Sequence, residues 1–212
     1  MKIIKRQFPH SPILSRCIYC GTSAGELTRE HIVPRGLNEQ FTLQRASCKQ
    51  CSNTTKEIER QILQGPMWEP RTKMRMSTRH KGQRPKTFPV LIEREGHRDE
   101  INVQIEKLPA WLWLPVFRLP AFIDKRHHDK RVETHNVSGG VWILSGQRLV
   151  KELGEELNAD SIALTVTYTG HDFGRLLAKI AYGFAIREFG VRIIDHAYVL
   201  SAIRGDSKDI GK

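Results

Sequence analysis

The most regular apolar pattern in the chain lies near its C-terminal end. Between residues 172 and 190, apolar side chains recur at spacings of three and four, which is typical of a helix with one buried face. Asp172 and Gly190 are suitable as its N-cap and C-cap. We expect three basic residues to lie off the apolar stripe and in solvent: Arg175, Lys179 and Arg187. The stripe itself consists of Phe173, Leu176, Leu177, Ile180, Ala181, Phe184 and Ala185.

The middle of the chain alternates between strand and helix patterns. "FPVLIERE" and "INVQIE" have strand character and are separated by "GHRD", which predicts a hairpin. "GVWILSG" predicts another strand, "QRLVKELGEEL" a helix, and "SIALTVTYT" a strand in which Ile162, Leu164, Val166 and Tyr168 occupy alternate positions. We therefore expect residues 87–212 to form a mixed α+β domain, an accessory unit whose role the sequence does not indicate.

The first part of the chain predicts a separate, smaller unit. In "CSNTTKEIERQILQGP" a helix is expected to start directly after Cys51, with Thr54 and Glu57 as a capping box and Gly65 as its stop. We expect residues 1–65 to form one module and residues 66–86 a basic linker or arm. Seven Lys and Arg residues lie between 67 and 86, and they suit either phosphate contacts or a solvated loop.

The most apolar run in the chain, residues 108–123, is the one candidate for a membrane span. Residues 108–123 include three prolines and Arg118, and the run is shorter than the roughly 20 residues that span a bilayer. It is better interpreted as buried core or extended chain, with Trp111, Trp113, Phe117 and Phe122 as core candidates before base-stacking ones. Because no N-terminal stretch resembles a signal peptide, we expect a cytoplasmic protein without membrane contact.

The positive charge of the chain is concentrated in its first part. The net charge is +11, and residues 1–86 contain 17 Lys and Arg against 6 Asp and Glu, whereas residues 87–212 contain 17 of each kind. A local excess of this size favours a polyanionic partner such as nucleic acid over a mere solubility bias.

Four cysteines lie in the same basic region. Cys17 and Cys20 form one C-x-x-C pair and Cys48 and Cys51 another, and two such pairs complete the tetrahedral shell of a structural zinc site. Free thiols or a redox pair are the alternatives. The 27 residues between the pairs exceed a simple zinc-ribbon spacer, so this loop must contain further structure.

The loop contains "REHIVPRG", and with "CIYC" before it and "CKQC" after it the segment resembles the HNH endonuclease superfamily, specifically the group called HNH endonuclease type 5. The resemblance covers residues 17 to about 60. It implies a zinc-stapled ββα-metal module in which Glu30 binds a catalytic magnesium or manganese ion, His31 is the general base and Pro34 holds the strand exit.

This chain departs from the family pattern at two positions. The family places a second metal ligand directly after the fourth cysteine, where this chain has Ser52, with Asn53 next. One residue on a helix turns a side chain by about 100°, so either residue is a candidate, and Asn53 is the one we expect. Asn38 is the counterpart of a middle asparagine that orients the base. Glu57 and Glu59 suit a solvated helix face better than a second catalytic acid.

These patterns predict an α+β protein that hydrolyses phosphodiester bonds in nucleic acid, DNA rather than RNA. A nucleic-acid-binding module that keeps zinc but has lost cleavage is the main alternative, and a zinc-stabilised adaptor for an acidic protein is a third. His127 and His128 lie in "DKRHHDKR", which is better interpreted as a charged loop than as a metal site. The sequence does not indicate the oligomeric state.

Overall fold

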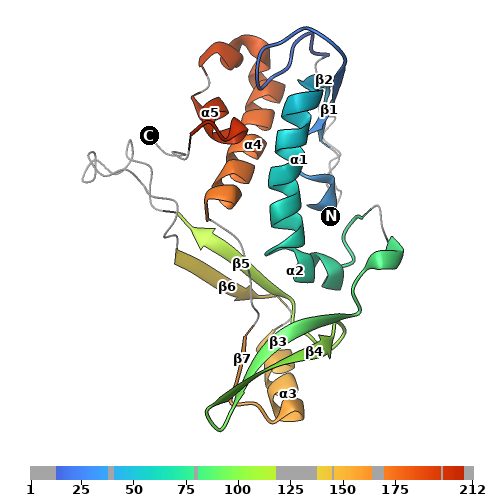
Figure 1. Ribbon diagram of the computed structural model, residues 1–212, viewed down its shortest axis with the longest axis vertical. Helices are drawn as coiled ribbons and strands as arrows, with labels where there is room; N and C mark the ends of the chain where they lie inside the picture. Colours follow the sequence, from blue (N-terminus) through green and yellow to red (C-terminus); the bar gives the residue numbers. More distant parts are fainter. Residues whose placement is uncertain are drawn as a thin grey trace, which may run out of the picture.

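A computed structural model provides the structure, and it describes residues 13–37, 41–78, 81–117, 138–144, 146–163, 170–196 and 198–207. The chain is a mixture of helices and strands, which confirms the expected α+β class (Figure 1). The strands in the described residues form three small antiparallel sheets, with the orders β1-β2, β4-β3-β7 and β5-β6.

The N-terminal elements form a strand–strand–helix unit. Strand β1 (Leu27–His31) pairs with β2 (Thr42–Cys48), and helix α1 (Lys49–Gln64) follows β2 without a loop. Cys48 is the N-cap in an extended conformation, so the helix starts at Lys49 rather than directly after Cys51, and the expected capping box at Thr54 and Glu57 is wrong. Thr54 instead donates to the carbonyl of Gln50, whereas Gly65 ends the helix as expected.

The segment expected to be a basic linker is partly folded. Helix α2 (Trp68–Lys73) follows α1 closely, and a short 3-10 turn, η2 (Lys81–Gln83), comes later in the segment. Another 3-10 turn, η1 (Arg35–Leu37), lies between β1 and β2. Glu69 and Pro70 of α2 are buried. Because these residues pack against neighbouring elements, this part of the segment is not an exposed arm.

A second unit, here called the sheet unit, is built from β3 (Thr87–Arg94), β4 (His97–Gln104), β7 (Ser161–Ala163) and α3 (Gln147–Leu157). The predicted hairpin is confirmed, and its two-residue turn places Glu95 and Gly96 at positive φ, as a type I′ turn requires. The unit has its own core, which consists of Phe88, Val90, Ile92, Val103, Ile105, Leu108 and Leu153.

The apolar run after the hairpin is extended rather than helical. It forms β5 (Trp111–Val116), which pairs with β6 (Ser138–Ile143). Its tryptophans are half-buried. Residues 164–169, which include most of the expected alternating strand, lie outside the described residues, as do Asn38, Phe122, His127 and His128.

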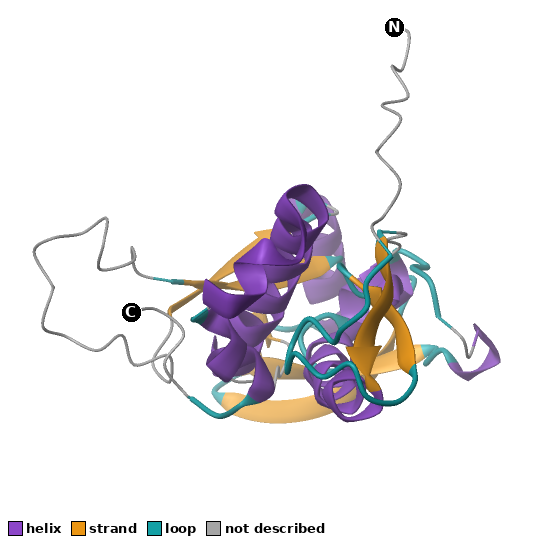
Figure 2. Ribbon diagram, turned by 90° about the horizontal axis from the view of Figure 1, so that it is seen from above, coloured by secondary structure: helices purple, strands orange, loops and turns teal. Residues whose placement is uncertain are grey.

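The C-terminal helices pack on the N-terminal unit rather than on the sheet unit. Helix α4 (Gly170–Phe189), the 3-10 segment η4 (Gly190–His196) and α5 (Val199–Arg204) follow one another, and α4 runs beside α1 (Figures 1 and 2). One core joins both ends of the described chain and includes Ile18, Tyr19, Ile32, Leu43, Tyr182, Ile186 and Ile203. This packing differs from the expected division into residues 1–65 and 87–212.

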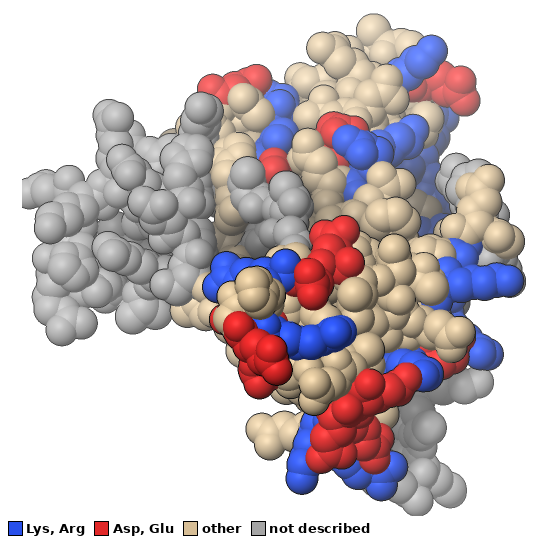
Figure 3. Space-filling model, turned by 60° about the horizontal axis from the view of Figure 1, so that its bottom comes forward, with Lys and Arg blue, Asp and Glu red and all other residues tan. Residues whose placement is uncertain are grey.

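Charges on the sheet unit are mixed. Figure 3 views the molecule from the end that carries this unit, and acidic and basic side chains are interspersed there. Several pair with each other, such as Lys107 with Glu156 and Lys151 with Glu155. Among the described helices, none is long and apolar enough to cross a membrane.

Candidate metal centre and cleft

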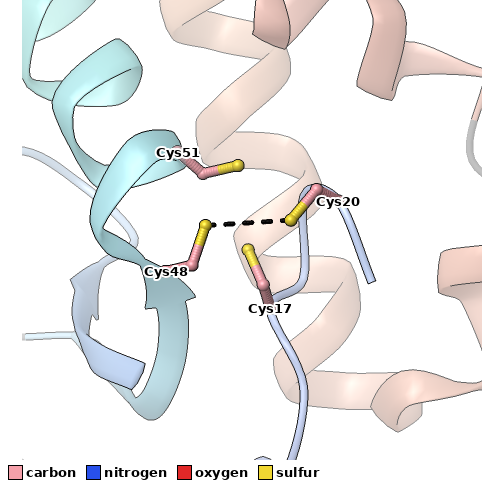
Figure 4. A group of neighbouring side chains, drawn as sticks. All are labelled: Cys17, Cys20, Cys48 and Cys51. Carbon is pink, nitrogen blue, oxygen red and sulfur yellow. Dashed lines mark hydrogen bonds between the residues drawn. The ribbon is translucent and has the colours of Figure 1, made fainter. Parts of the chain in front are cut away.

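The four cysteines converge at the point where β2 becomes α1. Cys48 ends β2 and Cys51 lies in the first turn of α1, while Cys17 and Cys20 come from a turn that precedes β1 (Figure 4). That turn is closed by hydrogen bonds from Gly21 N to Cys17 O (2.9 Å) and from Cys17 N to Thr22 O (2.8 Å). Gly21 has φ +74°, a conformation that glycine adopts without a steric cost.

The sulfur geometry suits a tetrahedral metal ion. All four Sγ atoms lie within 4.8 Å of one another, and Cys20 and Cys48 are 3.7 Å apart. A tetrahedral zinc site with Zn–S bonds of about 2.3 Å requires sulfurs about 3.8 Å apart, whereas a disulfide requires about 2.05 Å. The cysteines are free, so together they could hold a metal ion such as zinc.

Glu30 and His31 lie at the end of β1, and an irregularity in the hairpin decides which way they face. The register shifts between Thr28 and Glu30, where β2 has extra residues and Arg45 has φ +51°. Strict alternation is broken there, so that Leu27 and Glu30 are both buried. The bulge therefore places a carboxylate on the face of the strand that packs against the core.

The carboxylate of Glu30 is enclosed by polar partners. Tyr19 donates its hydroxyl to Oε1 of Glu30 (3.1 Å), and the ammonium of Lys179 lies 3.2 Å from the same oxygen. Burial raises the pKa of Glu30, and the charge of Lys179 opposes this change. Burial and Glu30 together raise the pKa of Tyr19, which keeps its hydroxyl a donor.

Lys179 comes from α4 and is the residue that the sequence prediction misplaced. We expected it in solvent, but its side chain is fully buried. Its ammonium donates to Oε1 of Glu59 (2.6 Å) and to the backbone carbonyl of His31, and so joins α4, α1 and β1. The expectation failed because the buried face of α4 is rotated relative to the predicted stripe: Leu177 is 44% exposed.

His31 is half-buried beside this network. Burial lowers its pKa; Lys179, Arg29 and Arg35 lower it further, whereas Glu59 raises it. The neutral imidazole is thus favoured near neutral pH. Its Nδ1 is buried and has no hydrogen-bond partner within the described part of the chain. Buried polar atoms are rarely left in this state, so this nitrogen has a hydrogen-bonding capacity that the described residues do not use.

A cleft of about 320 Å³ opens in front of these residues. Basic side chains line it on several sides: Arg29, Arg35, Lys56 and Arg71. Arg71 also fixes one wall, because its guanidinium donates to the carbonyls of Gly36 (2.7 Å) and Leu63 (2.8 Å). A Cβ on Gly36 would lie 2.7 Å from this guanidinium, so the close contact requires glycine.

Helix α1 contributes the opposite wall. Ser52, Thr55 and Glu59 line the cleft, at spacings that place them on one face of the helix. Asn53 is exposed and is not among the lining residues, because one step along a helix turns the side chain by about 100°. The structure therefore brings Ser52 to Glu30 and His31, and directs Asn53 elsewhere.

Glu57 and Glu59 of α1 have different surroundings, because residues two positions apart on a helix lie on different faces. Glu57 is exposed and pairs with Arg60 (2.6 Å), as expected for a solvated face. Glu59 was also expected there, but it is partly buried and bound to Lys179. Sequence reasoning thus missed Glu59 and Lys179. The burial of Lys179 could have been inferred from its spacing, because it lies on the same face of α4 as Leu176, Tyr182, Gly183 and Ile186.

No protein-family model matches this chain, and comparisons with curated proteins and with solved structures also gave no match. The four-cysteine cluster is not specific to one family. The function must therefore be argued from the chemistry of the cleft.

Proposed function

We propose that the protein is a zinc-stabilised, metal-dependent endonuclease of the HNH type that hydrolyses phosphodiester bonds, in DNA rather than RNA. One observation carries this proposal: an acid and a histidine, whose Nδ1 has no hydrogen-bond partner among the described residues, stand together at the end of β1 in the lining of a cation-lined cleft. The elements around them are two strands and a helix joined by the cysteine cluster.

Each side chain has a role in that reaction. His31 is the general base, since a neutral imidazole can take a proton from the attacking water at neutral pH. Arg29, Arg35, Lys56 and Arg71 attract the backbone of the nucleic acid and stabilise the negative charge that grows on the phosphate. Lys179 holds the carbonyl of His31 and so fixes the position of the base.

The proposal includes two kinds of metal ion. Zinc on the four cysteines is structural, since four protein ligands leave no open position. A catalytic magnesium or manganese ion prefers oxygen ligands, and the cleft offers them on Glu30, Ser52, Thr55 and Glu59. Such an ion would stabilise the departing 3′ oxygen.

A plasmid cleavage assay tests the proposal. Purified protein is incubated with supercoiled plasmid in magnesium or manganese, and we expect His31→Ala to lower the cleavage rate by about 100-fold or more, because a general base contributes 10²–10⁴-fold. The matched control is His97→Ala, a histidine at the exposed start of β4. Equal cleavage by the wild type and His31→Ala would exclude His31 as the base.

A module that binds nucleic acid without cutting it is the second candidate. Lys179 already neutralises Glu30, and Ser52 stands where a stronger ligand is expected. This candidate predicts no cleavage in any divalent ion but an affinity that falls steeply with salt. Binding that is absent at low salt would instead favour an adaptor for an acidic protein.

A further inference from the structure

The cleft continues past Arg71 into a second cavity. This cavity has a volume of about 280 Å³ and lies where α1 ends and α2 begins, because Gln64 and Trp68 both line it. Arg71 and Thr78 border the cleft and the second cavity alike. The two spaces therefore adjoin, and a long ligand in the cleft can extend into the second cavity.

The second cavity is positively charged. Arg71 and Arg84 line it, and none of its described lining residues is acidic. Burial lowers the pKa of Arg71, and the nearby charge of Arg84 lowers it further. The described partners of both guanidiniums are uncharged backbone carbonyls, such as those of Gly36 and Met76. An anion in this cavity would compensate two positive charges that the described residues leave uncompensated.

Arg84 has donors that such an anion can reach. Its Nη2 donates to the carbonyl of Met76, which anchors the guanidinium. Its Nε and Nη1 have no acceptor among the residues described, and neither atom is fully buried. A guanidinium presents its remaining N–H groups as a planar fork that matches the oxygens of a phosphate. The second cavity therefore offers a phosphate a charged donor that is already held in position.

An aromatic ring stands beside this donor. Trp68 lines the second cavity but not the cleft, and it is 46% exposed. Its ring meets Phe88 edge to face at 5.8 Å, and this contact supports the indole at the start of α2. A single exposed aromatic residue has no meaning by itself. Next to a basic groove, however, an aromatic ring is the usual stacking surface for an unpaired base.

The combined length of the two spaces favours a polymer over a small anion. Ser52 lines the cleft and Gln64 lines the second cavity, at opposite ends of α1. At 1.5 Å per residue, these two positions are about 18 Å apart along the helix axis. One strand of DNA covers that distance with about five nucleotides at 3.4 Å each. A strand that lies along α1 can therefore occupy both spaces at once.

We propose that the cleft and the second cavity form one track for a single, unpaired strand of nucleic acid. Arg84 binds a phosphate of that strand with the charge of Arg71 behind it, and Trp68 stacks on a neighbouring base. In a duplex the faces of the bases are covered by their own neighbours, so Trp68 would meet no base face. The substrate class is therefore nucleic acid with unpaired nucleotides beside the cleaved bond.

The place of the cleaved bond, at His31, rests on the proposed function, whereas the track itself does not. Negative supercoiling favours the separation of the two strands, so supercoiled plasmid supplies unpaired regions. The track thus adds a requirement for the structure of the substrate to a reaction that was argued from the cleft alone.

Fluorescence anisotropy measures binding to the track directly. The full chain with its zinc is titrated into labelled oligothymidine or into a labelled duplex of the same length, without magnesium or manganese. We expect the single strand to bind more tightly, although a duplex has the higher charge density and would be preferred by charge alone. That order requires contacts to exposed bases.

Variants of Trp68 separate stacking from packing. Trp68→Leu should weaken oligothymidine binding about 5-fold or more, the loss expected for one stacked base, and leave duplex binding within about 2-fold. Trp68→Phe keeps a ring and should retain most of the affinity. The matched control is Trp142→Leu, since Trp142 is 47% exposed and borders neither the cleft nor the second cavity.

Arg84→Ala tests the phosphate contact. It should weaken the binding of oligothymidine and lower the slope of log affinity against log salt concentration by about 0.7, the value for one phosphate of a single strand. Arg148→Ala is the control, since it removes the same charge from a residue of α3 that pairs with Glu152 at 3.1 Å. Inorganic polyphosphate has phosphates but no bases, so Arg84→Ala should weaken its binding and Trp68→Leu should not.

Several results would overturn the track. They are an equal loss of oligothymidine affinity in Trp68→Leu and Trp142→Leu, an equal loss in Trp68→Leu and Trp68→Phe, tighter binding of the duplex, and no binding of oligothymidine at low salt. Because the titration contains no catalytic ion, it does not depend on cleavage. Plasmid cleavage that requires His31, together with single-strand binding that ignores Trp68, would keep the nuclease and reject the track. Binding that requires Trp68 without any cleavage would keep the track and reject the nuclease.

Discussion

At the scale of single residues, the central feature is a lysine with no access to water. An ammonium removed from water loses several kcal/mol of hydration, which only good ionic and hydrogen-bond partners offset. Lys179 has Glu30, Glu59 and the carbonyl of His31. The cluster therefore depends on all of its members, and removing one charge leaves the others buried and uncompensated.

Replacing Lys179 by methionine tests this dependence. The two carboxylates would remain in place without a cation, so we expect the free energy of unfolding to fall by about 3–5 kcal/mol, measured by urea denaturation at neutral pH. The matched control is Lys151→Met, since Lys151 pairs with Glu155 on the surface at 3.8 Å and should matter by less than about 1 kcal/mol. Similar small losses in both variants would show that the buried cluster is not structural.

Glu69 makes the free energy of unfolding depend on pH. Burial raises its folded pKa to about 7, above the unfolded value of about 4.3, so the folded state binds the proton more tightly. Stability from this group is therefore present below the unfolded pKa and is lost as the pH rises through about 7. We expect Glu69→Leu to gain roughly 2–4 kcal/mol of unfolding free energy relative to the wild type between pH 4 and pH 8.

Denaturant titrations of both proteins at several pH values measure that difference. Groups common to the two proteins cancel, so a constant difference across this range would contradict the raised pKa of Glu69.

Residues fixed by spacing were predictable, and those fixed by packing were not. Two C-x-x-C pairs leave few alternatives to one shared site, and the cysteines do converge. The choice between Ser52 and Asn53 depended on where α1 starts, and the sequence suggested a start several residues too late. The partners of Lys179 were unpredictable because they lie more than 100 residues away in the sequence.

At the scale of elements, periodicity located most segments but not their orientation. Helix α3 has the expected bounds, and the β3–β4 hairpin has the expected turn. The buried face of α4 was misjudged because it contains two glycines and a lysine, which carry little apolar signal. Gly183 lies on that face and packs against Ile32, which follows β1.

The variant Gly183→Ala tests how closely α4 packs against Ile32. An added Cβ would lie 3.0 Å from Cγ2 of Ile32, a side chain that is 1% exposed and closely packed. We expect the clash to exceed the gain in helix propensity of about 1 kcal/mol, so the melting temperature should fall. Gly154→Ala in α3 is the control, since its Cβ would meet nothing closer than 3.7 Å and should stabilise the protein. An equal gain in both variants would mean that α4 and Ile32 are not tightly packed.

At the scale of the whole molecule, the two ends of the described chain form one structure. Tyr182 donates to the carbonyl of Ile18 (2.6 Å), and Arg204 donates to that of Tyr19 (3.1 Å). Both acceptors lie between Cys17 and Cys20, so α4 and α5 hold the first cysteine pair from outside. Sequence reasoning treated these helices as part of a second domain because local patterns carry no information about long-range contacts.

This arrangement predicts which segments lose their structure when the metal is removed. If zinc folds the cysteine turns, a strong chelator should release Ile18 and Tyr19 from the shared core, because metal-binding free energy is folding free energy. Hydrogen exchange followed by mass spectrometry should then show faster exchange in α4 and α5 as well as in residues 17–51. The β3–β4 hairpin, which has a separate core, serves as the internal control and should exchange as before. Faster exchange confined to residues 17–51 would show that the C-terminal helices are held independently of the metal, and unchanged exchange everywhere would show that the cysteines do not need one.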